Sequence, residues 1–400
     1  MEKIMIINSG SSSLKFKLFD NEDRQVLASG ILERIGLSGS RLKLKYGLDK
    51  KYELTQDITN HLQAIELLLK VLKELDIVTD LSEIKGVGHR VVAGGEYFSR
   101  PVVIDNDVIK KIKELAELAP LHNPANLNGI KAFRKYLPQA TAVAVFDTAF
   151  HQTLPEENYL YSTPYEWYED FGVRRYGAHG ISHEYVAHEA AKLMGRPLTE
   201  LKLITCHLGA GASITAVKNG RSFDTSMGFT PLSGLQMATR AGDVDISLAN
   251  YMMKKLELSS MSEMVYLLNE KSGFLGVSGV SADMRDVEEA AETGNKRAQL
   301  AIKLFYHNIL RYVGQYITEM GGVDGIVFTG GIGENSPETS EEIMKKLAYL
   351  GVTLNETENK KRGQKTIISG PDSAITVMRI PTDEEYMIAQ NVWEILDEKA

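Results

Sequence analysis

The chain has a single cysteine, Cys206, among 400 residues. An intramolecular disulfide is therefore excluded, and we expect a reducing compartment. Cys206 lies within an apolar run, which favours a buried packing role over a catalytic thiol. No apolar run is long enough to span a membrane, and the N-terminus has neither the basic region nor the cleavage site of a signal peptide. These absences predict a cytoplasmic protein with no membrane partner.

An excess of positive charge is also lacking. The net charge of −8 argues against a protein that coats nucleic acid. It does not exclude an anionic substrate, because local arginines and lysines decide that. The composition, 43% hydrophobic and 24% charged, is ordinary for a globular protein, and 400 residues suffice for two or three domains.

What is present begins with a small, hydroxyl-rich turn between two apolar segments. Residues 8–15 read NSGSSSLK, with an apolar run at 4–7 before them and near-alternation from Leu14 to Asp20 after them. The turn is not a Walker A loop, because the GxxxxGK[ST] spacing is absent and no helix follows. Its backbone N–H groups, the hydroxyls of Ser11 and Ser13, and Lys15 are groups that hold phosphate oxygens. An ordinary tight hairpin explains the same pattern, and this stretch alone does not decide.

The pattern recurs in the second half. A strand is predicted over 201–208, followed by the small-residue turn 207–213 and another strand over 214–217. Each turn opens a half that is first strand-rich and then helix-rich. This indicates a two-copy repeat of architecture, and we expect the two loops to face each other across an interdomain cleft.

Hydrophobic periodicity predicts the other elements. Strands are expected over 26–32, 42–46, 84–92, 141–147, 222–226 and 324–329. Helices are expected over 61–75, 108–118, 125–136, 246–256, 262–269, 283–293, 296–320 and 383–396, and one opens at Ser336-Pro337.

Four residues that could carry chemistry stand at predicted strand ends or in loops: Arg90, Asp147, His179 and Arg240. Each has an ordinary structural explanation, as a surface ion pair, a turn acid or a local hydrogen bonder. Together, two arginines, a histidine and two phosphate-type loops suit an anionic acceptor and a phosphoryl group in transfer. Such transfer depends on positioning and charge neutralisation.

Two further segments carry weaker signals. Residues 330–335 (GGIGEN) are predicted to form a loop that exposes backbone to an adenine or ribose, although the Rossmann spacing is absent. Residues 382–385 (TDEE) form an acidic helix start. They complement the helix dipole or supply a Mg²⁺ ligand, directly or through water.

The motifs taken together resemble the acetate kinase (acetokinase) family, within the superfamily of acetate and sugar kinases, heat-shock chaperones and actin. The resemblance covers residues 4–390 in family order. It is carried by residues 8–16 (NSGSSSLKF), 88–92 (GHRVV), 120–124 (PLHNP), 146–153 (FDTAFHQT), 175–180 (RYGAHG), 224–231 (DTSMGFTP) and 331–336 (GIGENS).

The resemblance implies an α/β fold of two similar actin/ribonuclease H-like domains, each a mixed β-sheet flanked by helices. We expect one domain over 1–148 plus 383–400, and a nucleotide-binding domain over 149–382. The implied protein is a cytoplasmic homodimer. It would transfer the γ-phosphoryl group of ATP to acetate, reversibly and in line, giving acetyl phosphate and ADP. The implied cofactor is Mg²⁺, with Mn²⁺ as an alternative.

The resemblance also implies residue roles. Asn8 and Glu384 would serve Mg²⁺, while Arg90 and Arg240 would hold the carboxylate and the phosphoryl group. His179 would stabilise the transition state, and Asp147 would act near the acceptor. The ATP set is Ser11, Ser13, Lys15, His207, Leu208, Gly209, Ala210, Gly211, Asp283, Met284, Arg285, Gly331, Ile332, Gly333, Glu334 and Asn335. The acetate set is Arg90, Val92, Leu121, Ala178 and Pro231.

Acetate as acceptor constrains the role of Asp147. A hydroxyl acceptor needs a base to take its proton, but a carboxylate with a pKa near 4.3 is already ionised at pH 7. Asp147 therefore need not be a general base. We expect it to orient an arginine or the metal shell, with a kcat that is flat in pH around neutrality.

Three residues depart from the family pattern. Ala178 stands where the family usually has Phe, Ala210 where it has Asn, and Ala93 where His is common. Ala178 leaves open a kinase that prefers propionate or butyrate, and Ala210 bears on nucleotide choice. A third hypothesis, an ATP-switched binding protein on the same fold, does not account for the paired arginines and His179.

Overall fold

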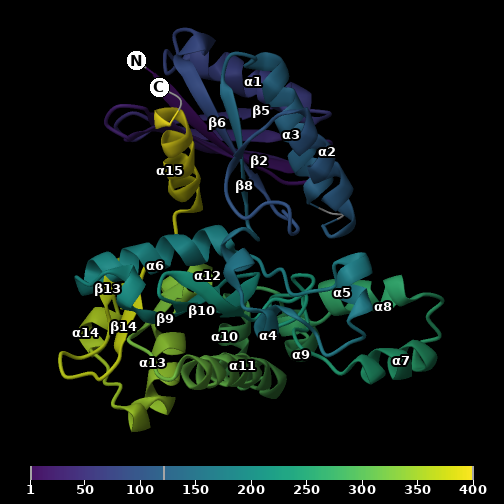
Figure 1. The fold of residues 1–400 in the computed structure, drawn as a ribbon, viewed down its shortest axis with the longest axis vertical. Helices are drawn as coiled ribbons and strands as arrows, with labels where there is room; N and C mark the ends of the chain where they lie inside the picture. The colour runs from purple at the N-terminus through teal and green to yellow at the C-terminus, as the bar shows by residue number, and fades with distance from the viewer. Residues whose placement is uncertain (1, 120–121, 399–400) are drawn as a thin grey trace. The chain divides into compact units, whose positions relative to one another are not determined.

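The computed structural model describes residues 2–119 and 122–398. The chain divides into two compact units. Unit 1 comprises Met1–Ala149 and Asp383–Ala400, and unit 2 comprises Phe150–Thr382. Each unit is a β-sheet with helices on its faces (Figure 1). Among the described residues, no helix combines the length and apolar character needed to cross a membrane.

Unit 1 is built on an eight-stranded mixed sheet with the order β5-β4-β3-β2-β1-β6-β8-β7. Its strands are β1 Lys3–Ser9, β2 Ser13–Asp20, β3 Val26–Glu33, β4 Arg41–Tyr46, β5 Lys50–Thr55, β6 Ile84–Val91, β7 Val102–Val103 and β8 Thr141–Phe146. Its helices are α1 His61–Glu74, α2 Asn106–Glu114, α3 Asn123–Tyr136 and α15 Glu384–Asp397.

Unit 2 is built on a six-stranded mixed sheet with the order β11-β10-β9-β12-β14-β13. Its strands are β9 Lys202–Leu208, β10 Ala212–Lys218, β11 Arg221–Thr225, β12 Gly325–Thr329, β13 Thr366–Ile367 and β14 Thr376–Arg379. Its helices are α4 Glu156–Tyr159, α5 Glu166–Phe171, α6 Gly180–Met194, α7 Ile246–Lys255, α8 Met261–Glu270, α9 Gly273–Ser278, α10 Met284–Glu292, α11 Lys296–Met320, α12 Gly330–Asn335, α13 Pro337–Lys346 and α14 Glu356–Asn359.

The two sheets share one topology. In each, a three-stranded antiparallel meander is followed by two parallel strands and a short antiparallel edge strand: β3-β2-β1-β6-β8-β7 corresponds to β11-β10-β9-β12-β14-β13. Unit 1 adds β4 and β5 at its meander edge. The expected α/β class and the repeat of architecture are therefore confirmed.

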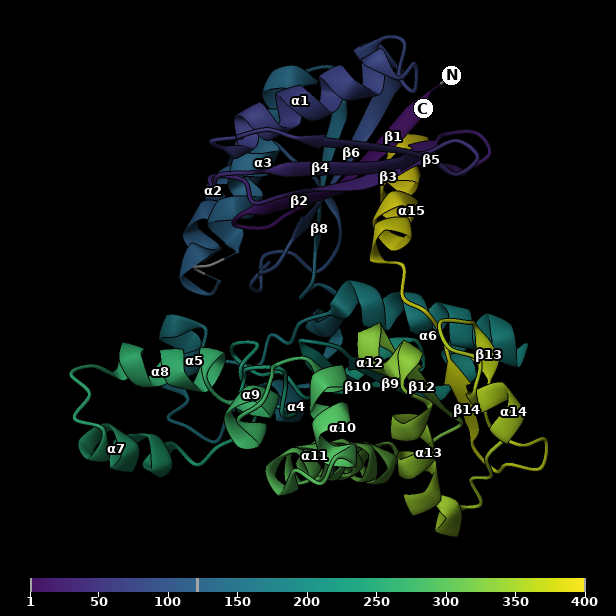
Figure 2. The same ribbon diagram turned by 180° about the vertical axis from the view of Figure 1, so that it is seen from behind.

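Opposite faces of each sheet are covered by different helices. In unit 2, Val186 and Ala190 of α6 pack with Leu203 on one face, whereas Phe305 and Ile309 of α11 belong to the core on the other face. Figure 1 shows α6 and α11 on the two sides of that sheet. In unit 1, α1 and α3 lie on one face and α15 on the other (Figure 2).

Glycines let α15 approach its sheet closely. A Cβ added at Gly86 would lie 2.6 Å from Val392 Cγ1, and one at Gly88 would lie 2.6 Å from Ile388 Cγ2. Only a hydrogen fits at either position of β6, so the helix backbone packs directly against the strand.

Most expected elements are present, and some predictions were wrong. Residues 330–335 form the short helix α12 rather than a loop, because the Glu334 carboxylate caps its own first turn by accepting from the Gly330 N–H at 2.9 Å. The helix expected over 108–118 ends at Glu114 and continues as a 3₁₀ turn. The prediction missed α6 and the strands β5, β7, β13 and β14, which lack a clear period or are short.

Candidate active site

In unit 1, Arg90 lies at the centre of a cluster of polar side chains. It donates from Nε to Asp147 Oδ1 at 3.0 Å, and Nη2 pairs with the other carboxylate oxygen, so the contact is bidentate. Nη1 reaches Asn8 Oδ1 at 3.4 Å, and Nε lies 3.7 Å from Glu384 Oε2. Burial would lower the pKa of Arg90, but the carboxylates of Asp147 and Glu384 outweigh it and raise the pKa. Four residues that the sequence singled out therefore meet here.

Strand ends place these side chains together. Asn8 is near the end of β1, Arg90 near the end of the parallel strand β6, and Asp147 directly follows β8, which is also parallel to β6. Because parallel strands end at the same edge, their terminal side chains converge. Glu384 joins them from the first turn of α15, whose cap is Asp383. Asp383 also accepts from Lys17 Nζ at 2.7 Å, which fixes the helix start against β2.

Two buried asparagines of α3 hold the segments that follow these strand ends. Asn126 donates to the Ser9 carbonyl at 2.8 Å and accepts from the Val92 N–H at 3.2 Å. Asn123 accepts from the Ala93 N–H and donates to the Ala93 carbonyl, each at 3.0 Å. The two asparagines therefore fix the backbone beside Asn8 and Arg90.

The turn after Asn8 is closed by its own backbone. The Gly10 N–H donates to the Ser13 carbonyl at 2.8 Å, and the His61 ring bonds the Gly10 carbonyl at 2.8 Å. Ser11 and Lys15 are exposed, and Ser13 is half-buried. The turn thus presents hydroxyl and ammonium groups to the surroundings, as a phosphate loop requires.

In unit 2, the corresponding turn brings His179 and Arg240 together. A Cβ added at Gly211 would lie 3.3 Å from His179 Nε2 and 3.8 Å from Arg240 Nη1. His179 has φ 57° and stands at the N-terminus of α6. Such a left-handed conformation is uncommon for a residue with a side chain, although six other non-glycine residues among those described share it.

Arg240 differs from Arg90 in its partners. Its Nη1 donates to the Pro231 carbonyl at 3.3 Å and lies 3.8 Å from Met237 Sδ. Within the described ranges, no carboxylate lies within ion-pair distance of it. Burial lowers the pKa of Arg240, and the carboxylate of Glu270 opposes this only in part. Its positive charge is therefore available to an anionic ligand.

Four histidines gather beneath this turn. The rings of His179 and His207 stack with centroids 4.3 Å apart, and His183 lies edge-on to His207 and to His151. Burial lowers the pKa of His151 to about 4, despite its bond to the Ala178 carbonyl. Burial, with His151 and His207 nearby, lowers the pKa of His183 well below its usual value.

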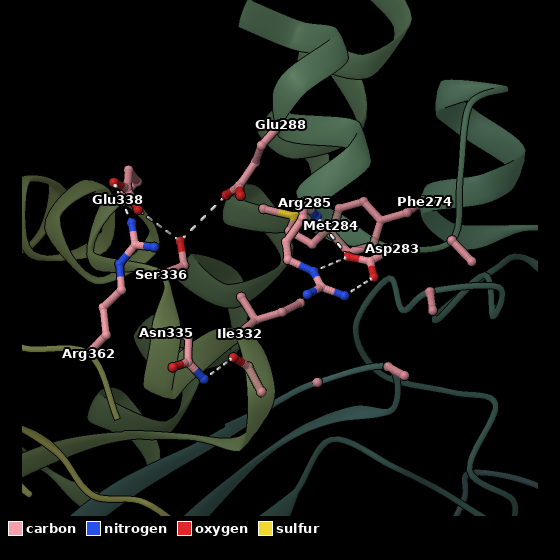
Figure 3. A pocket seen from close by; sticks show the side chains of 15 residues that line it. Phe274, Asp283, Met284, Arg285, Glu288, Ile332, Asn335, Ser336, Glu338 and Arg362 are labelled. Atoms are coloured by element: carbon pink, nitrogen blue, oxygen red, sulfur yellow. Dashed lines mark hydrogen bonds and ion pairs between the residues drawn. The ribbon is translucent and has the colours of Figure 1, made fainter. Parts of the chain in front are cut away.

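A pocket of about 450 Å³ opens within unit 2 beside the same turn (Figure 3). It lies between the Gly209 turn, α10 and α12. Its lining residues are Gly209, Ala210, Ala238, Phe274, Ala282, Asp283, Met284, Arg285, Glu288, Gly331, Ile332, Asn335, Ser336, Glu338 and Arg362. The size and the mixed apolar and polar lining suit a nucleotide.

The pocket is polarised along its length. Glycine backbone from the Gly209 turn and from Gly331 forms one part, where a Cβ added at Gly209 would lie 3.7 Å from the Gly331 nitrogen. Glu288 and Glu338 lie elsewhere in the pocket, and each is 3.5 Å from Ser336 Oγ. Burial and the charge of Glu338 raise the pKa of Glu288. Arg362 lies 3.7 Å from Glu338 and offsets part of this negative charge, whereas the glycine part offers backbone groups to phosphate.

An ion pair stands at the pocket rim. Arg285 donates to Asp283 from Nε at 3.0 Å and from Nη2 at 2.6 Å (Figure 3). The hydrogen bond from Arg285 lowers the pKa of Asp283 to about 2. Asp283 also caps α10, so the pair is fixed at a helix start.

The comparisons with known proteins agree with one another. A model of the acetokinase family matches residues 3–390. The chain belongs to the acetokinase family. The acetate kinase of Fructilactobacillus sanfranciscensis is 57% identical over 98% of each chain, and that of Bacillus subtilis (strain 168) is 53% identical over 98% of this chain and 99% of its own.

Solved structures give the same result for the acetokinase fold. The crystal structure of Porphyromonas gingivalis acetate kinase has a TM-score of 0.94 and 46% identity, covering 99% of this chain and 100% of that chain. The structure of a propionate kinase from Francisella tularensis subsp. tularensis SCHU S4 has a TM-score of 0.92 and 41% identity, covering 98% of this chain and 100% of that chain.

The expected nucleotide residues divide into two groups. Those that line the pocket are Gly209, Ala210, Asp283, Met284, Arg285, Gly331, Ile332 and Asn335. Those outside its lining are Ser11, Ser13 and Lys15, which belong to unit 1, and His207, Leu208, Gly211, Gly333 and Glu334 of unit 2. Glu334 accepts hydrogen bonds from the N–H groups of Gly330 and Thr382 and so links the start of α12 to the segment before α15.

The expected acetate residues are spread along the chain. Val92 is half-buried in unit 1, whereas Ala178, which is 4% exposed, and the half-buried Pro231 belong to unit 2. Ala178 packs in the same apolar cluster as Met227. Leu121 lies outside the described residues.

Sequence reasoning missed Asn126 and several pocket residues. Among the latter, Phe274 and Ala238 belong to no short motif, and Arg362 comes from a loop far along the chain. Ser336 was recognised as a helix cap but not as part of the pocket. Asn123 stood in the quoted PLHNP motif, and its spacing of three to Asn126 on a helix was an available signal.

Proposed function

We propose that this member of the acetokinase family transfers the γ-phosphoryl group of ATP to the carboxylate of acetate, reversibly, giving acetyl phosphate and ADP. The observation that carries the proposal is the meeting of Arg240 and His179 at Gly211, beside a glycine-lined pocket of nucleotide size. We treat residues 1–148 and 383–400 as the acceptor-binding half and residues 149–382 as the nucleotide-binding half.

The pocket orients ATP by charge. The phosphates lie along the backbone of Gly209, Ala210 and Gly331, and the base lies toward Ile332 and Met284. The carboxylates of Glu288 and Glu338 would repel phosphates placed the other way round. The γ-phosphoryl group then reaches Arg240 and His179, whose side chains neutralise its charge as it is transferred.

The acceptor needs no base. Acetate is ionised at neutral pH, so its oxygen attacks the phosphorus directly and ADP leaves in line. Asp147 orients Arg90 through the bidentate pair, and Arg90 binds the acetate carboxylate. Val92, Ala178, Pro231 and Leu121 would surround the methyl group. Water would compete as acceptor, so phosphoryl transfer requires that it be excluded from the site.

A divalent ion, Mg²⁺ or Mn²⁺, belongs to this chemistry. The amide oxygen of Asn8 and the carboxylate of Glu384 are the oxygen donors that Mg²⁺ prefers, and both contact Arg90. Among the described residues, no group of three or more His, Cys, Asp or Glu side chains forms a complete cage. These residues therefore fit an ion that keeps its waters and phosphate ligands. When bound, it neutralises phosphate charge.

A hydroxamate assay tests the proposal. Purified protein with ATP, Mg²⁺ and acetate should form acetyl hydroxamate when hydroxylamine is present, because hydroxylamine traps acetyl phosphate. Product that depends on acetate supports a carboxylate kinase. Nucleotide binding without product, with each carboxylate tried, would favour an ATP-switched binding protein instead.

A short-chain acyl kinase that prefers propionate or butyrate is the second candidate. Ala178 favours it, because an alanine at an acyl pocket leaves more room than an aromatic ring. One methylene is worth about 1–3 kcal/mol in an apolar pocket, so selectivity should be graded. Comparing kcat/KM for acetate, propionate and butyrate decides between the candidates. Equal acetate-over-propionate ratios in the wild type and Ala178→Phe would contradict a role for Ala178.

The working form is proposed to be a homodimer. Helices α7 and α8 of unit 2 expose Ile246, Tyr251, Val265 and Tyr266, each at least 43% accessible. A second copy would cover such apolar side chains. Light scattering during size exclusion should give twice the chain mass of 44.4 kDa, and a monomer at micromolar concentration would contradict this.

A further inference from the structure

A chain of hydrogen bonds leads from the core of unit 2 to the His179 ring. Thr205 Oγ1 donates to the Thr215 carbonyl at 3.4 Å and lies 2.7 Å from His183 Nδ1. His183 Nε2 lies 2.7 Å from Ser213 Oγ, and Ser213 Oγ lies 2.8 Å from His179 Nδ1. This series of hydrogen bonds therefore joins β9, α6 and β10, and none of its members is a carboxylate.

The Thr205 end of this series of hydrogen bonds decides which group donates at every link. The Thr215 carbonyl can only accept, so we take the Thr205 hydroxyl to donate to it across 3.4 Å rather than to His183. Thr205 Oγ1 then accepts from His183, which places the His183 proton on Nδ1. The buried His183 ring is neutral, as its lowered pKa indicates, so Nε2 carries a lone pair. Ser213 donates to that lone pair, and its oxygen accepts from the N–H at Nδ1 of His179.

We propose that this relay fixes the proton of His179 on Nδ1 and directs its Nε2 atom toward Gly211 and Arg240. Ser213 and His183 are then positioning residues for phosphoryl transfer. Their kinetic role rests on the proposed function, whereas the tautomer does not.

The direction of the relay has a chemical consequence. A protonated His179 has an N–H at both nitrogens, and Ser213 oxygen already faces Nδ1 as an acceptor. His179 can therefore gain a proton at Nε2, and present it to a phosphoryl oxygen, with no rearrangement of the relay. If every hydrogen bond of the relay ran the other way, the Ser213 hydroxyl would donate to Nδ1 of His179. Protonation of His179 would then require donor and acceptor to exchange at every link.

A neighbouring histidine supplies an internal reference. His151 Nε2 lies 3.0 Å from the Ala178 carbonyl, so the neutral ring carries its proton on Nε2. Its Nδ1 accepts from Ser222 Oγ at 2.8 Å. His151 therefore has the opposite tautomer to that inferred for His179 and His183.

Nuclear magnetic resonance of ¹⁵N-histidine-labelled protein tests the tautomers. Multiple-bond N–H correlations are recorded on the full chain without ligands, at a pH where the rings are neutral, and are assigned with His179→Gln and His151→Gln. We expect protons on Nδ1 of His179 and His183 and on Nε2 of His151. A proton on Nε2 of neutral His179 or His183 would overturn the proposal.

Serine variants test the positioning role. Ser213→Ala should lower kcat about tenfold with both KM values within about twofold, and Ser213→Thr, which keeps a hydroxyl, should restore most of it. Ser222→Ala is the matched control, because it removes an equally buried Ser–His bond that does not reach the His179 ring. Equal losses in Ser213→Ala and Ser222→Ala would contradict the relay. Absence of acetyl phosphate from every protein would instead refute the proposed function and leave the tautomer result intact.

Discussion

The two units set an arginine beside equivalent turns of one topology, but they treat its charge in opposite ways. In unit 1, Arg90 is fixed by Asp147 and has Glu384 nearby, and these carboxylates raise its pKa. In unit 2, Arg240 bonds a carbonyl and a sulfur, and burial lowers its pKa. A neutralised arginine is a rigid bidentate donor, whereas an arginine without a paired acid attracts an anion strongly. The comparison supports the proposal that unit 1 orients the acceptor and unit 2 attracts the charge in transfer.

The largest expected effect comes from breaking the Arg90 pair. Asp147→Asn leaves a charge in a site where Asp147 is almost fully buried, and removing one member of such a pair costs about 3–5 kcal/mol. Urea unfolding measures this loss. The matched control is Asp283→Asn, since Arg285 is highly exposed and such a pair contributes about 0–1 kcal/mol. Similar losses in both variants would show that burial does not distinguish the two pairs.

Removing the arginine of unit 2 should act on turnover instead. Arg240→Ala removes the guanidinium that meets His179 at Gly211, and loss of one such donor lowers kcat by about 10²–10³-fold. The melting temperature should change little, because no ion pair of the described residues is broken. Arg240→Lys should recover little activity, since lysine lacks the planar fork. Turnover within tenfold of wild type in Arg240→Ala would contradict the contrast between the units.

The buried histidines make stability depend on pH. The pKa of His151 is about 4 in the folded protein and near 6.5 when unfolded, so between these values the unfolded chain binds more protons. Stability therefore falls as the pH drops from about 6.5 to 4, by about 3 kcal/mol for this group. The melting temperature against pH should be flatter in His151→Gln than in wild type. His307→Gln, at an exposed site on α11, is the control. If the dependence of its melting temperature on pH were flattened equally, burial of His151 would not be the cause.

The smallest effect should come from the strand-end brace of unit 1. Asn126→Ala leaves the Ser9 carbonyl and the Val92 N–H without their side-chain partner, at a cost of about 1–3 kcal/mol. Because these groups flank Asn8 and Arg90, the KM for acetate should rise while the KM for ATP stays constant. Glu334→Ala, which frees the N–H groups of Gly330 and Thr382 in unit 2, should do the reverse. If Asn126→Ala and Glu334→Ala changed the KM for the same substrate, the two units would not have separate substrate-binding roles.

The repeated hairpins could be predicted because they depend on local sequence. The segment from Leu14 to Asp20 alternates, and the turn before it is small and polar, so period and turn chemistry agree. The helix α6 was missed because it is buried on nearly all sides and shows little amphipathic period. The helix α12 was mistaken for a loop because its glycines disfavour helix, and only the folded position of Glu334 supplies its cap.

The candidate site was predictable as a set of residues and not as an arrangement. Arg90, Asp147, His179 and Arg240 were singled out by their positions at strand ends or in loops, and by what two arginines, a histidine and two phosphate-type loops suit together. That Arg90 is paired and Arg240 is not depends on side chains from distant segments. The Ser213–His183 relay was also invisible in the sequence, because a serine on a buried strand usually satisfies only its own backbone neighbours.

The close packing of α15 on β6 also bears on how the chain is made. A Cβ at Gly86 would lie within 4 Å of both Ile4 and Leu396, so β1 begins beside the point where α15 ends. Until residues 384–397 have been synthesised, the face of β1 and β6 that carries Ile4, Ile6, Gly86 and Gly88 has no cover. The unit that leaves the ribosome first is therefore the last to be completed. A nascent chain stopped at Thr382 would present this face to chaperones, while unit 2, continuous in sequence, already has all its helices.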